Sequence, residues 1–304
     1  MSDETFTLPA FAKINLSLRV LGRRADGYHE LRTVFQTISL RDELTFESSA
    51  GGGIELICAA PDIPSDVGNL VHRAATALRE RFGVRRGARI RLVKRIPAGG
   101  GLGGGSSDAA TALVGLTHLW GIETEAGELS KIGARLGADV PFFLTGGTAL
   151  GTGTGADITP LEDEARRHLI LVTPCVRVST ADAYGALNAT ALTKAESAVI
   201  LPISHMEAEF HDSPREVWSN DFEPVVFRLF PEIERAKDAL TKAGARRAIL
   251  SGSGSSVFGV FDKESEAGRA RGVLVVEDGW QVFACATLSR GEHRQAFGQC
   301  AAIL

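Results

Sequence analysis

Residues 97–108 read Pro-Ala-Gly-Gly-Gly-Leu-Gly-Gly-Gly-Ser-Ser-Asp. Six of these residues are glycines, whose backbone amides have no Cβ beside them to keep a ligand away. The pattern predicts a strand over residues 89–96, directly before this run, and a helix that begins near Ser106, directly after it. Because a helix N-terminus presents unpaired N–H groups and a positive dipole end, this succession favours a phosphate-binding loop.

Three other loop types share this glycine content. A Walker A loop needs a lysine after its glycines, and none follows here, which excludes it. A dinucleotide-binding fingerprint is formally met by Gly99, Gly101 and Gly104, with Glu123 near the position of the ribose-binding acid. The chain lacks the regular βαβ alternation that this fingerprint requires. A flexible hinge before a serine-capped helix leaves the direct succession of strand, glycines and amphipathic helix unexplained, so phosphate binding is favoured.

Periodicity outside the glycine run predicts an α+β chain of two layered domains. Apolar and polar residues alternate over residues 11–21, which predicts a half-buried strand with Lys13 and Asn15 on its polar face. The Asp26-Gly27 turn and a returning strand over residues 31–40 follow. Three helices are predicted next: residues 70–82 between an Asn69 cap and Gly83, residues 109–120, and a helix that starts at Thr124 and ends at Gly137.

The second half of the chain starts after a glycine and threonine cluster at residues 146–155. The predicted elements there are a strand (169–173), two helices (222–229 and 232–243), a strand–turn–strand unit (248–261) and a closing strand pair (272–276 with 281–287). Strands outnumber crossover helices, which favours an α+β fold over a doubly wound sheet. We expect one domain over residues 1–160 and a second over residues 161–304.

Composition narrows the function classes. The chain has 304 residues, a formal net charge of -4 and a pI near 6.0, which argue against nucleic acid as a partner. No run approaches the roughly 18 apolar residues of a membrane span, and no signal peptide or C-x-x-C pair is visible. We therefore expect a cytoplasmic monomer or homodimer without a membrane partner. One local basic cluster fits either a solvated strand face or ligand steering: Arg85, Arg86, Arg89, Arg91, Lys94 and Arg95.

Three motifs in order resemble the galactokinase, homoserine kinase, mevalonate kinase and phosphomevalonate kinase (GHMP) superfamily. The first is Ala-Lys-Ile-Asn-Leu at residues 12–16, the second is the glycine run, and the third is Ser-Gly-Ser-Gly-Ser-Ser at residues 251–256. The resemblance implies an N-terminal domain like ribosomal protein S5 domain 2, a ferredoxin-like C-terminal domain, and the use of ATP with Mg²⁺. The ATP-binding residues that it implies are Pro97, Gly99, Gly100, Gly101, Leu102, Gly103, Gly104, Gly105, Ser106 and Ser107.

Two further segments narrow this resemblance. Residues 22–31 (G-R-R-A-D-G-Y-H-E-L) and residues 137–141 (G-A-D-V-P) resemble the branch that phosphorylates the 2-hydroxyl of a cytidine diphosphate-linked methylerythritol in the non-mevalonate isoprenoid route. The implied partner is therefore a small cytidine diphosphate-linked polyol. Two alternatives remain: another superfamily kinase of the homoserine or mevalonate type, and a non-catalytic ATP-binding regulatory module.

The reacting groups come from the first motif and from residues 137–141. Spacing alone leaves Asp139 equally suited to be a catalytic base or the N-cap of a short helix that starts at Val140. The resemblance places the catalytic aspartate at Asp139 and pairs it with Lys13. It does not settle whether Lys13 holds Asp139 ionised or stabilises the phosphoryl oxygens.

The acceptor substrate is expected at the first hairpin and the third motif. A turn tip usually carries plain surface residues, but the resemblance implies that Tyr28 stacks on the cytosine and that His29 hydrogen-bonds its edge. It also makes Tyr184 the aromatic residue on the opposite face of the base. The other substrate-binding residues that we expect are Asn15, Gly252, Ser253 and Gly254.

Two charged residues near the glycine run are harder to place. In the predicted strand over residues 89–96, Lys94 shares a face with apolar residues, which favours a position near the nucleotide unless a bulge intervenes. Asp108 would repel a bound triphosphate. Its position is explained equally well by the preference for acidic residues in the first turn of a helix. The metal ligands are not indicated by the sequence.

Overall fold

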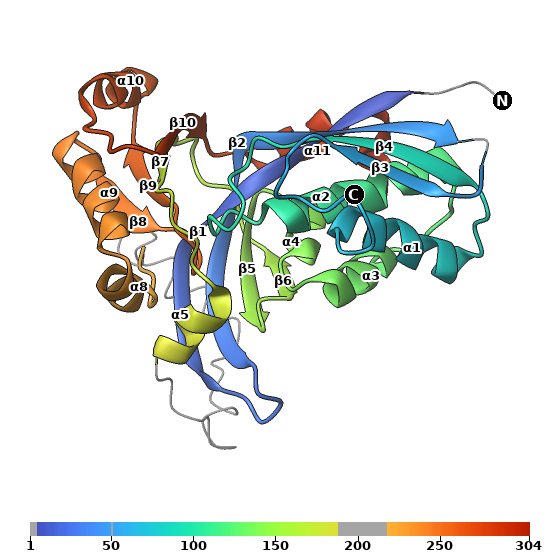
Figure 1. The fold of residues 1–304 in the computed structure, drawn as a ribbon, viewed down its shortest axis with the longest axis horizontal. Coiled ribbons are helices and arrows are strands. Elements are labelled where there is room, and N and C mark those ends of the chain that lie inside the picture. The colour runs from blue at the N-terminus through green and yellow to red at the C-terminus, as the bar shows by residue number, and fades with distance from the viewer. Residues whose placement is uncertain (1–4, 50, 188–217) are drawn as a thin grey trace.

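The computed structural model describes residues 5–49, 51–187 and 218–304, which form two β-sheets with helices packed on them (Figure 1). The first sheet has the strand order β3-β4-β2-β5-β6, and β1 pairs with β2 outside this path. Its strands are β1 (Phe6–Arg23), β2 (His29–Ser49), β3 (Ile54–Cys58), β4 (Gly87–Val93), β5 (Thr148–Gly153) and β6 (Asp157–Pro160). The second sheet is antiparallel, with the order β10-β7-β9-β8. Its strands are β7 (His168–Thr173), β8 (Arg247–Leu250), β9 (Val257–Phe261) and β10 (Gln281–Ala286).

The long β1–β2 hairpin connects the two sheets. Its apolar residues Ala12, Ile14 and Leu16 share a buried cluster with Leu169 and Phe258 of the second sheet, and its tip projects from the body of the molecule (Figure 1). The two strands predicted here are confirmed but extend further than predicted. The polar face of β1 is also buried from Lys13 to Ser17, because this part of the hairpin lies between two layers: Lys13 and Asn15 are 4% and 1% exposed. Arg19, nearer the tip, is exposed.

Helices α1 (Leu70–Phe82), α2 (Gly104–Trp120) and α4 (Val140–Thr145) pack against the first sheet, and α3 (Glu128–Leu136) packs against these three helices. Helix α1 begins and ends as predicted, since the Asn69 side chain accepts a hydrogen bond from the Val71 amide and Gly83 is left-handed. Helix α2 starts at Gly104 rather than near Ser106, with left-handed Gly103 as its cap, so a serine cap is excluded. The predicted start of α3 at Thr124 is wrong, because left-handed Gly127 forms the cap.

Helices α5 (Thr180–Ala186), α8 (Glu223–Leu229), α9 (Pro231–Lys242) and α10 (Glu264–Val273) belong to the second layer. The two predicted helices at α8 and α9 are confirmed within about one residue. The strand pair predicted over residues 272–276 and 281–287 is wrong: residues 272 and 273 end α10, and β10 pairs with β7. The apolar run from Val273 to Val276 favours a strand by composition, but Val273 and Val275 are exposed and lie outside the core.

The chain returns to the first layer at its end. Helix α11 (Arg290–Ala296) and the 3₁₀ helix η1 (Gly298–Ile303) follow β10, and Phe297 and Cys300 are buried in the same core cluster as α1 and α2. The predicted division after residue 160 stays a prediction. Within the described residues, no helix is long and apolar enough to span a bilayer.

Candidate functional site

Lys13 and Asp139 lie next to each other, although they come from β1 and from the turn before α4. Their Nζ and Oδ2 atoms are 3.6 Å apart, and the side chains are 5% and 32% exposed. Helix α4 does begin at Val140, as the capping alternative requires, but within this described segment the Asp139 side chain accepts no capping hydrogen bond from a backbone amide. The carboxylate of Asp139 is therefore available for an interaction other than helix capping, and it forms an ion pair with the Lys13 ammonium.

A short polar chain fixes the Lys13 ammonium. Lys13 Nζ donates to Asn15 Oδ1 at 2.7 Å, Asn15 Nδ2 donates to Thr33 Oγ1 at 2.7 Å, and the Thr33 hydroxyl donates to the Ser17 carbonyl at 2.7 Å. Burial lowers the pKa of Lys13, and the nearby Asp139 carboxylate partly offsets this by raising it. Both side-chain groups of Asn15 are thus used inside the protein. Thr33, on β2, was not predicted, because its role depends on the pairing of β1 with β2.

The end of the glycine run lies against this lysine. The Lys13 amide donates to the Leu102 carbonyl at 3.0 Å. Gly103 has a φ of 70°, and a Cβ on it would lie 2.6 Å from Phe143 Cζ and 3.2 Å from Lys13 Cγ. Only glycine fits this close approach with this backbone conformation. The N-terminus of α2 and the Lys13–Asp139 pair therefore share one site.

The third motif packs on the second. Ser251 Oγ donates to the Gly101 carbonyl at 3.0 Å, and the Ser256 amide donates to the Gly100 carbonyl at 3.1 Å. A Cβ on Gly101 would lie 2.0 Å from the Ser251 carbonyl oxygen, and one on Gly254 would lie 2.1 Å from the Gly101 nitrogen. The two loops are in backbone contact, which explains why both are rich in glycine.

The third-motif loop is held by a residue that sequence reasoning missed. Asn220 Nδ2 donates to the Leu250 and Gly252 carbonyls at 2.9 and 2.7 Å, and Asn220 forms a β-bridge with Leu18. A Cβ on Gly252 would be 3.4 Å from Lys13 Nζ, so this loop also borders the lysine. Ser253 is at the outer side, where its hydroxyl lies 3.3 Å from Thr180 Oγ1 at the start of α5.

An aromatic pair joins the base of the hairpin tip to α5. The rings of His29 and Tyr184 stack with centroids 4.6 Å apart at 25°, and Tyr184 meets Phe222 edge-on. Burial lowers the pKa of His29, with a smaller contribution from Arg23, which favours a neutral imidazole at pH 7. Burial also raises the pKa of Tyr184 to about 12, and Asp139 adds to this rise. Tyr28 lies beside this pair in sequence but is 66% exposed.

The two predicted serines differ in their surroundings. Ser107 is buried, and its hydroxyl donates to the Phe11 carbonyl at 2.6 Å, so its proton is already used. Ser106 is half-buried and lies beside Gly137, which precedes Asp139 by two residues. Of the two hydroxyls, that of Ser106 is better placed to meet a ligand.

Lys94 lies just beyond β4, so the predicted strand to residue 96 is wrong and the argument from a shared strand face does not apply. Its Nζ atom donates to Asp108 Oδ2 at 2.7 Å and to Asp42. Asp108 is the fifth residue of α2, beyond the first turn, so the first-turn explanation for this acid is also wrong. Both residues belong to a buried ion cluster.

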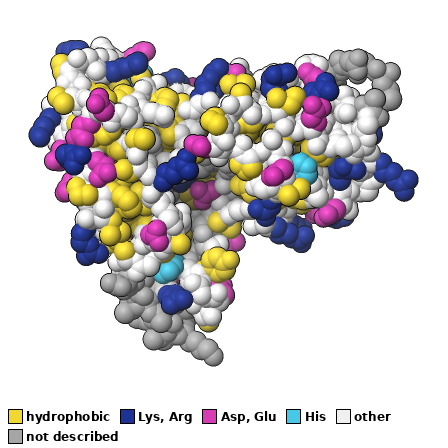
Figure 2. Space-filling model, viewed as in Figure 1, with side chains coloured by type: hydrophobic (Ala, Val, Ile, Leu, Met, Phe, Trp, Pro, Cys, Tyr) yellow, Lys and Arg dark blue, Asp and Glu magenta, His cyan; other side chains and the backbone are white. Residues whose placement is uncertain are grey.

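Three of the six residues in the basic cluster noted in the sequence form ion pairs. Arg89 contacts Glu55 and Glu47, Arg95 contacts Glu43, and Lys94 points inward. Acidic and basic side chains are interspersed on the face shown in Figure 2, which is hollowed between the two layers. These contacts favour a solvated, salt-bridged strand face over ligand steering for Arg89 and Arg95.

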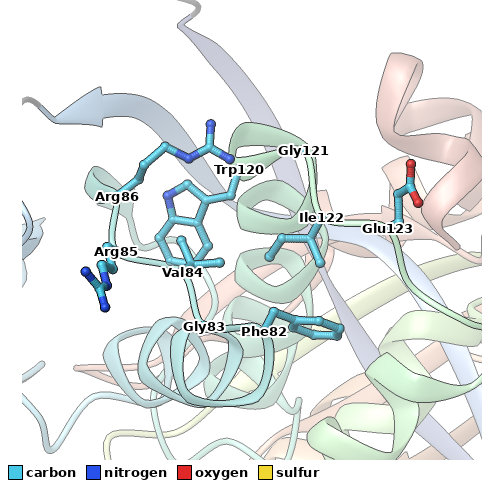
Figure 3. A pocket seen from close by; sticks show the side chains of 9 residues that line it. All are labelled: Phe82, Gly83, Val84, Arg85, Arg86, Trp120, Gly121, Ile122 and Glu123. Carbon is cyan, nitrogen blue, oxygen red and sulfur yellow. The ribbon is translucent and has the colours of Figure 1, made fainter.

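A separate hollow of about 420 Å³ lies where α1 and α2 end, at Gly83 and Gly121, with Arg85, Arg86 and Trp120 along it (Figure 3). The described residues that line it are all different from the predicted site residues. The chemistry-bearing groups gather instead at the opposite, N-terminal end of α2.

Comparison with known proteins places this chain in a family. Residues 69–147 match the GHMP kinases N terminal domain, and residues 200–275 match the GHMP kinases C terminal domain. The chain is similar to a 4-diphosphocytidyl-2-C-methyl-D-erythritol kinase from Citrifermentans bemidjiense, with 42% identity over 281 residues that cover 92% of this chain and 98% of the relative. A protein of the same name from Prosthecochloris aestuarii is 44% identical over 269 residues, which cover 88% and 93% of the two chains.

Solved structures agree with these relatives. A crystal structure of 4-(cytidine 5'-diphospho)-2C-methyl-D-erythritol kinase matches with a TM-score of 0.75 and 35% identity, over 93% of this chain and 99% of that one. A homoserine kinase from Cytophaga hutchinsonii matches over 95% and 96% of the two chains, with a TM-score of 0.69; at 22% identity it shows the shared fold alone. The predicted GHMP fold is confirmed. The chain belongs to the 4-diphosphocytidyl-2-C-methyl-D-erythritol kinase family, within the GHMP kinases.

Proposed function

We propose that this protein transfers the γ-phosphoryl group of ATP to the 2-hydroxyl of 4-diphosphocytidyl-2-C-methyl-D-erythritol. The observation that carries the proposal is the Lys13–Asp139 pair, which lies beside the end of a glycine loop in a member of this kinase family. Phosphoryl transfer needs a positioned hydroxyl, a group that accepts its proton, and positive charge near the transferring phosphoryl. The pair supplies the second and third of these at one place.

Asp139 is the proposed base, because its carboxylate is partly exposed and accepts no capping hydrogen bond in the described residues around it. Lys13 is held by Asn15 on one side and by Asp139 on the other, so its ammonium stays in place without a bound ligand. From there it forms an ion pair with the Asp139 carboxylate and lies near the charge that develops on the phosphoryl oxygens. Asn15 acts through Lys13 in this arrangement.

The glycine loop and the start of α2 are proposed to bind the triphosphate. Gly105 is exposed in the first turn of α2, where unpaired amides and the helix dipole favour an anion. Among the described residues, no group of three or more His, Cys, Asp or Glu side chains is arranged to hold a metal. The loop fits a Mg²⁺ ion that enters bound to phosphate oxygens, as is usual for this ion, and the half-buried Ser106 hydroxyl would be available to it. Bound there, Mg²⁺ neutralises phosphate charge.

The cytidine end of the acceptor is proposed to bind at the projecting hairpin and α5. His29 and Tyr184 already stack on each other there, and neutral His29 has one N–H donor and one acceptor nitrogen for a base edge. Tyr28 adds an exposed aromatic face at the same tip. The loop with Gly252, Ser253 and Gly254 lies between this pair and Lys13, where its amides suit a diphosphate.

A substrate panel tests this assignment against other GHMP kinases. Purified protein is incubated with MgATP and, in separate reactions, 4-diphosphocytidyl-2-C-methyl-D-erythritol, homoserine and mevalonate, and ADP formation is measured. We expect turnover with the cytidine compound alone. Turnover with homoserine or mevalonate at comparable kcat/KM would assign the protein to another activity of the superfamily.

Replacing the exposed tyrosine at the hairpin tip tests base stacking. We expect Tyr28→Ala to raise the KM for the cytidine substrate by about 5- to 150-fold, since a stacked base contributes about 1–3 kcal/mol, and to leave the KM for ATP unchanged. Leu21→Ala is the matched control, because Leu21 is another exposed apolar residue of the same hairpin. Equal changes in both KM values for Tyr28→Ala would argue against stacking.

Adding one methyl group, by Gly105→Ala, tests whether phosphate approaches the loop closely. Gly105 has ordinary backbone angles, and a Cβ added to it would have only Leu70 within 4 Å, so Gly105→Ala fits the folded protein. Its exposed Cβ would meet a phosphate bound at the α2 N-terminus, and we expect a Kd for MgATP about tenfold higher, with an unchanged or raised Tm. Gly268→Ala, in the exposed part of α10, is the control for the gain in helix propensity. An unchanged Kd for MgATP would show that no phosphate group of ATP binds at this turn of α2.

A further inference from the structure

A buried cluster of three charged residues lies behind the glycine loop. Lys94 donates from Nζ to Asp108 Oδ2 at 2.7 Å and to Asp42 Oδ2, and the side chains of Lys94, Asp42 and Asp108 are 10%, 0% and 4% exposed. Each comes from a different element: Asp42 from β2, Lys94 from the segment after β4, and Asp108 from α2. The cluster therefore joins three parts of the first layer.

The same cluster holds the residues that lead into the glycine loop. Asp42 Oδ1 accepts hydrogen bonds from the backbone amides of Arg95 and Ile96, the latter at 2.8 Å. Those amides directly precede Pro97. With the Lys94 contact, one buried carboxylate receives three donors from three successive residues, which fixes the course of the chain just before the loop.

The other end of the loop is held through Asp108. Asp108 is one turn into α2, and a Cβ added to Gly104, the first residue of α2, would lie 3.2 Å from Lys94 Nζ. The loop itself, residues 97–103, contains three glycines with positive φ: Gly99, Gly101 and Gly103. Such a segment has a large conformational entropy in isolation, so anchoring both of its ends reduces the number of conformations that it can adopt.

We propose that Asp42, Lys94 and Asp108 are positioning residues for ATP: their cluster holds the two ends of the glycine loop at the separation that phosphate binding requires. This inference rests on the proposed function of the loop. It assigns Lys94 a role through the loop backbone, since its ammonium is already bonded to two carboxylates and is largely buried. Preorganised amides bind an anion more tightly because less ordering is needed on binding.

The electrostatics of the cluster suit a fixed anchor. Asp42 receives hydrogen bonds from three donors, so both of its carboxylate oxygens are used within the cluster. Asp108 has one charged donor, and its Oδ1 atom lacks a hydrogen-bond partner within the described structure. Burial, reinforced by Asp42, raises the pKa of Asp108 to about 7, although Lys94 opposes the shift. Asp108→Asn is therefore a mild change, whereas Lys94→Met leaves two buried acids without their shared cation.

The test measures MgATP binding separately from turnover and folding. Kd for MgATP is obtained by calorimetric titration, and Tm by thermal unfolding, for wild type, Lys94→Met, Asp108→Asn and the double variant. We expect Lys94→Met to raise Kd about tenfold and Asp108→Asn about threefold, with the KM for the cytidine substrate within about twofold of wild type. The double variant should lose less than the product of the two single changes, because Asp108 is unpaired once Lys94 is gone. Arg89→Met, on the exposed face of β4, is the control and should bind as wild type.

The outcomes separate this inference from its alternatives. Single variants that bind MgATP like wild type, with or without a lower Tm, would show a purely structural cluster and overturn the proposal. If Lys94→Met does not fold, the test relies on the near-isosteric Asp108→Asn. A Kd for MgATP equal to that of wild type in this variant would likewise overturn the proposal. Failure of the proposed function has a different signature, because wild type itself would then release no ADP with the cytidine substrate.

Discussion

Asp139→Asn is expected to reduce kcat by about 10²- to 10⁴-fold, the usual contribution of a positioned general base, while the Kd for MgATP stays within about twofold of wild type. Asparagine has nearly the same shape as aspartate, so the turn before α4 should keep its conformation. The amide cannot accept the proton of the substrate hydroxyl, and Lys13 loses its charged partner at 3.6 Å. Single-turnover kinetics with the cytidine substrate measures the chemical step directly.

The control for this variant is Asp238→Asn, which removes an exposed carboxylate on α9 and should leave kcat unchanged. A kcat for Asp139→Asn within tenfold of wild type would reject Asp139 as the base. A large loss of MgATP affinity would instead indicate that the carboxylate organises the nucleotide site.

Lys13→Met is expected to lower kcat by about 100-fold or more, because a buried cation beside the reacting groups is worth several kcal/mol in the transition state. Methionine keeps the length and apolar stem of the side chain but removes the charge. Burial lowers the pKa of Lys13, so its removal also removes the cost of burying an ammonium. This offsets the loss of the hydrogen bond donated to Asn15, and we expect a Tm close to that of wild type. The expected signature is therefore lost activity with retained stability.

Both kcat and Tm decide the interpretation of Lys13→Met. A marked fall in Tm would show that the chain through Asn15 and Thr33 is chiefly structural. Retained Tm with near-normal kcat would contradict the role of Lys13 in charge stabilisation. Lys242→Met, at the end of α9 in the second layer, is the control for loss of one positive charge.

Signals that act within a few residues predicted the fold well. The Asn69 cap and the left-handed Gly83 fix α1 from both ends, and both signals are local. The start of α3 was misplaced because Thr124 is a plausible cap, yet Gly127 adopts the left-handed conformation and begins the helix. The apolar run at Val273–Val276 has the composition of a strand, but its place in a sheet depends on partners that composition does not specify.

The residues of the candidate site fall into the same two groups, those with a local sequence signal and those that depend on tertiary contacts. Its named motifs are contiguous in sequence, so the glycine loop could be singled out from its own residues, and Lys13 and Asp139 from the resemblance of their segments to the family's motifs. Asp42, Thr33 and Asn220 carry no local signal, because each one works by hydrogen-bonding a backbone or side chain brought close by tertiary folding. The stacking of His29 on Tyr184 also depends on how the hairpin and α5 meet.

One assay tests the central claim most directly: ADP release, coupled to NADH oxidation, in purified protein with MgATP before and after 4-diphosphocytidyl-2-C-methyl-D-erythritol is added. We predict negligible ADP release with MgATP alone and steady release once the cytidine compound is present, with one ADP formed for each substrate molecule consumed. Binding of MgATP without ADP release after the addition would contradict the account and identify the chain as a nucleotide-binding module without kinase activity.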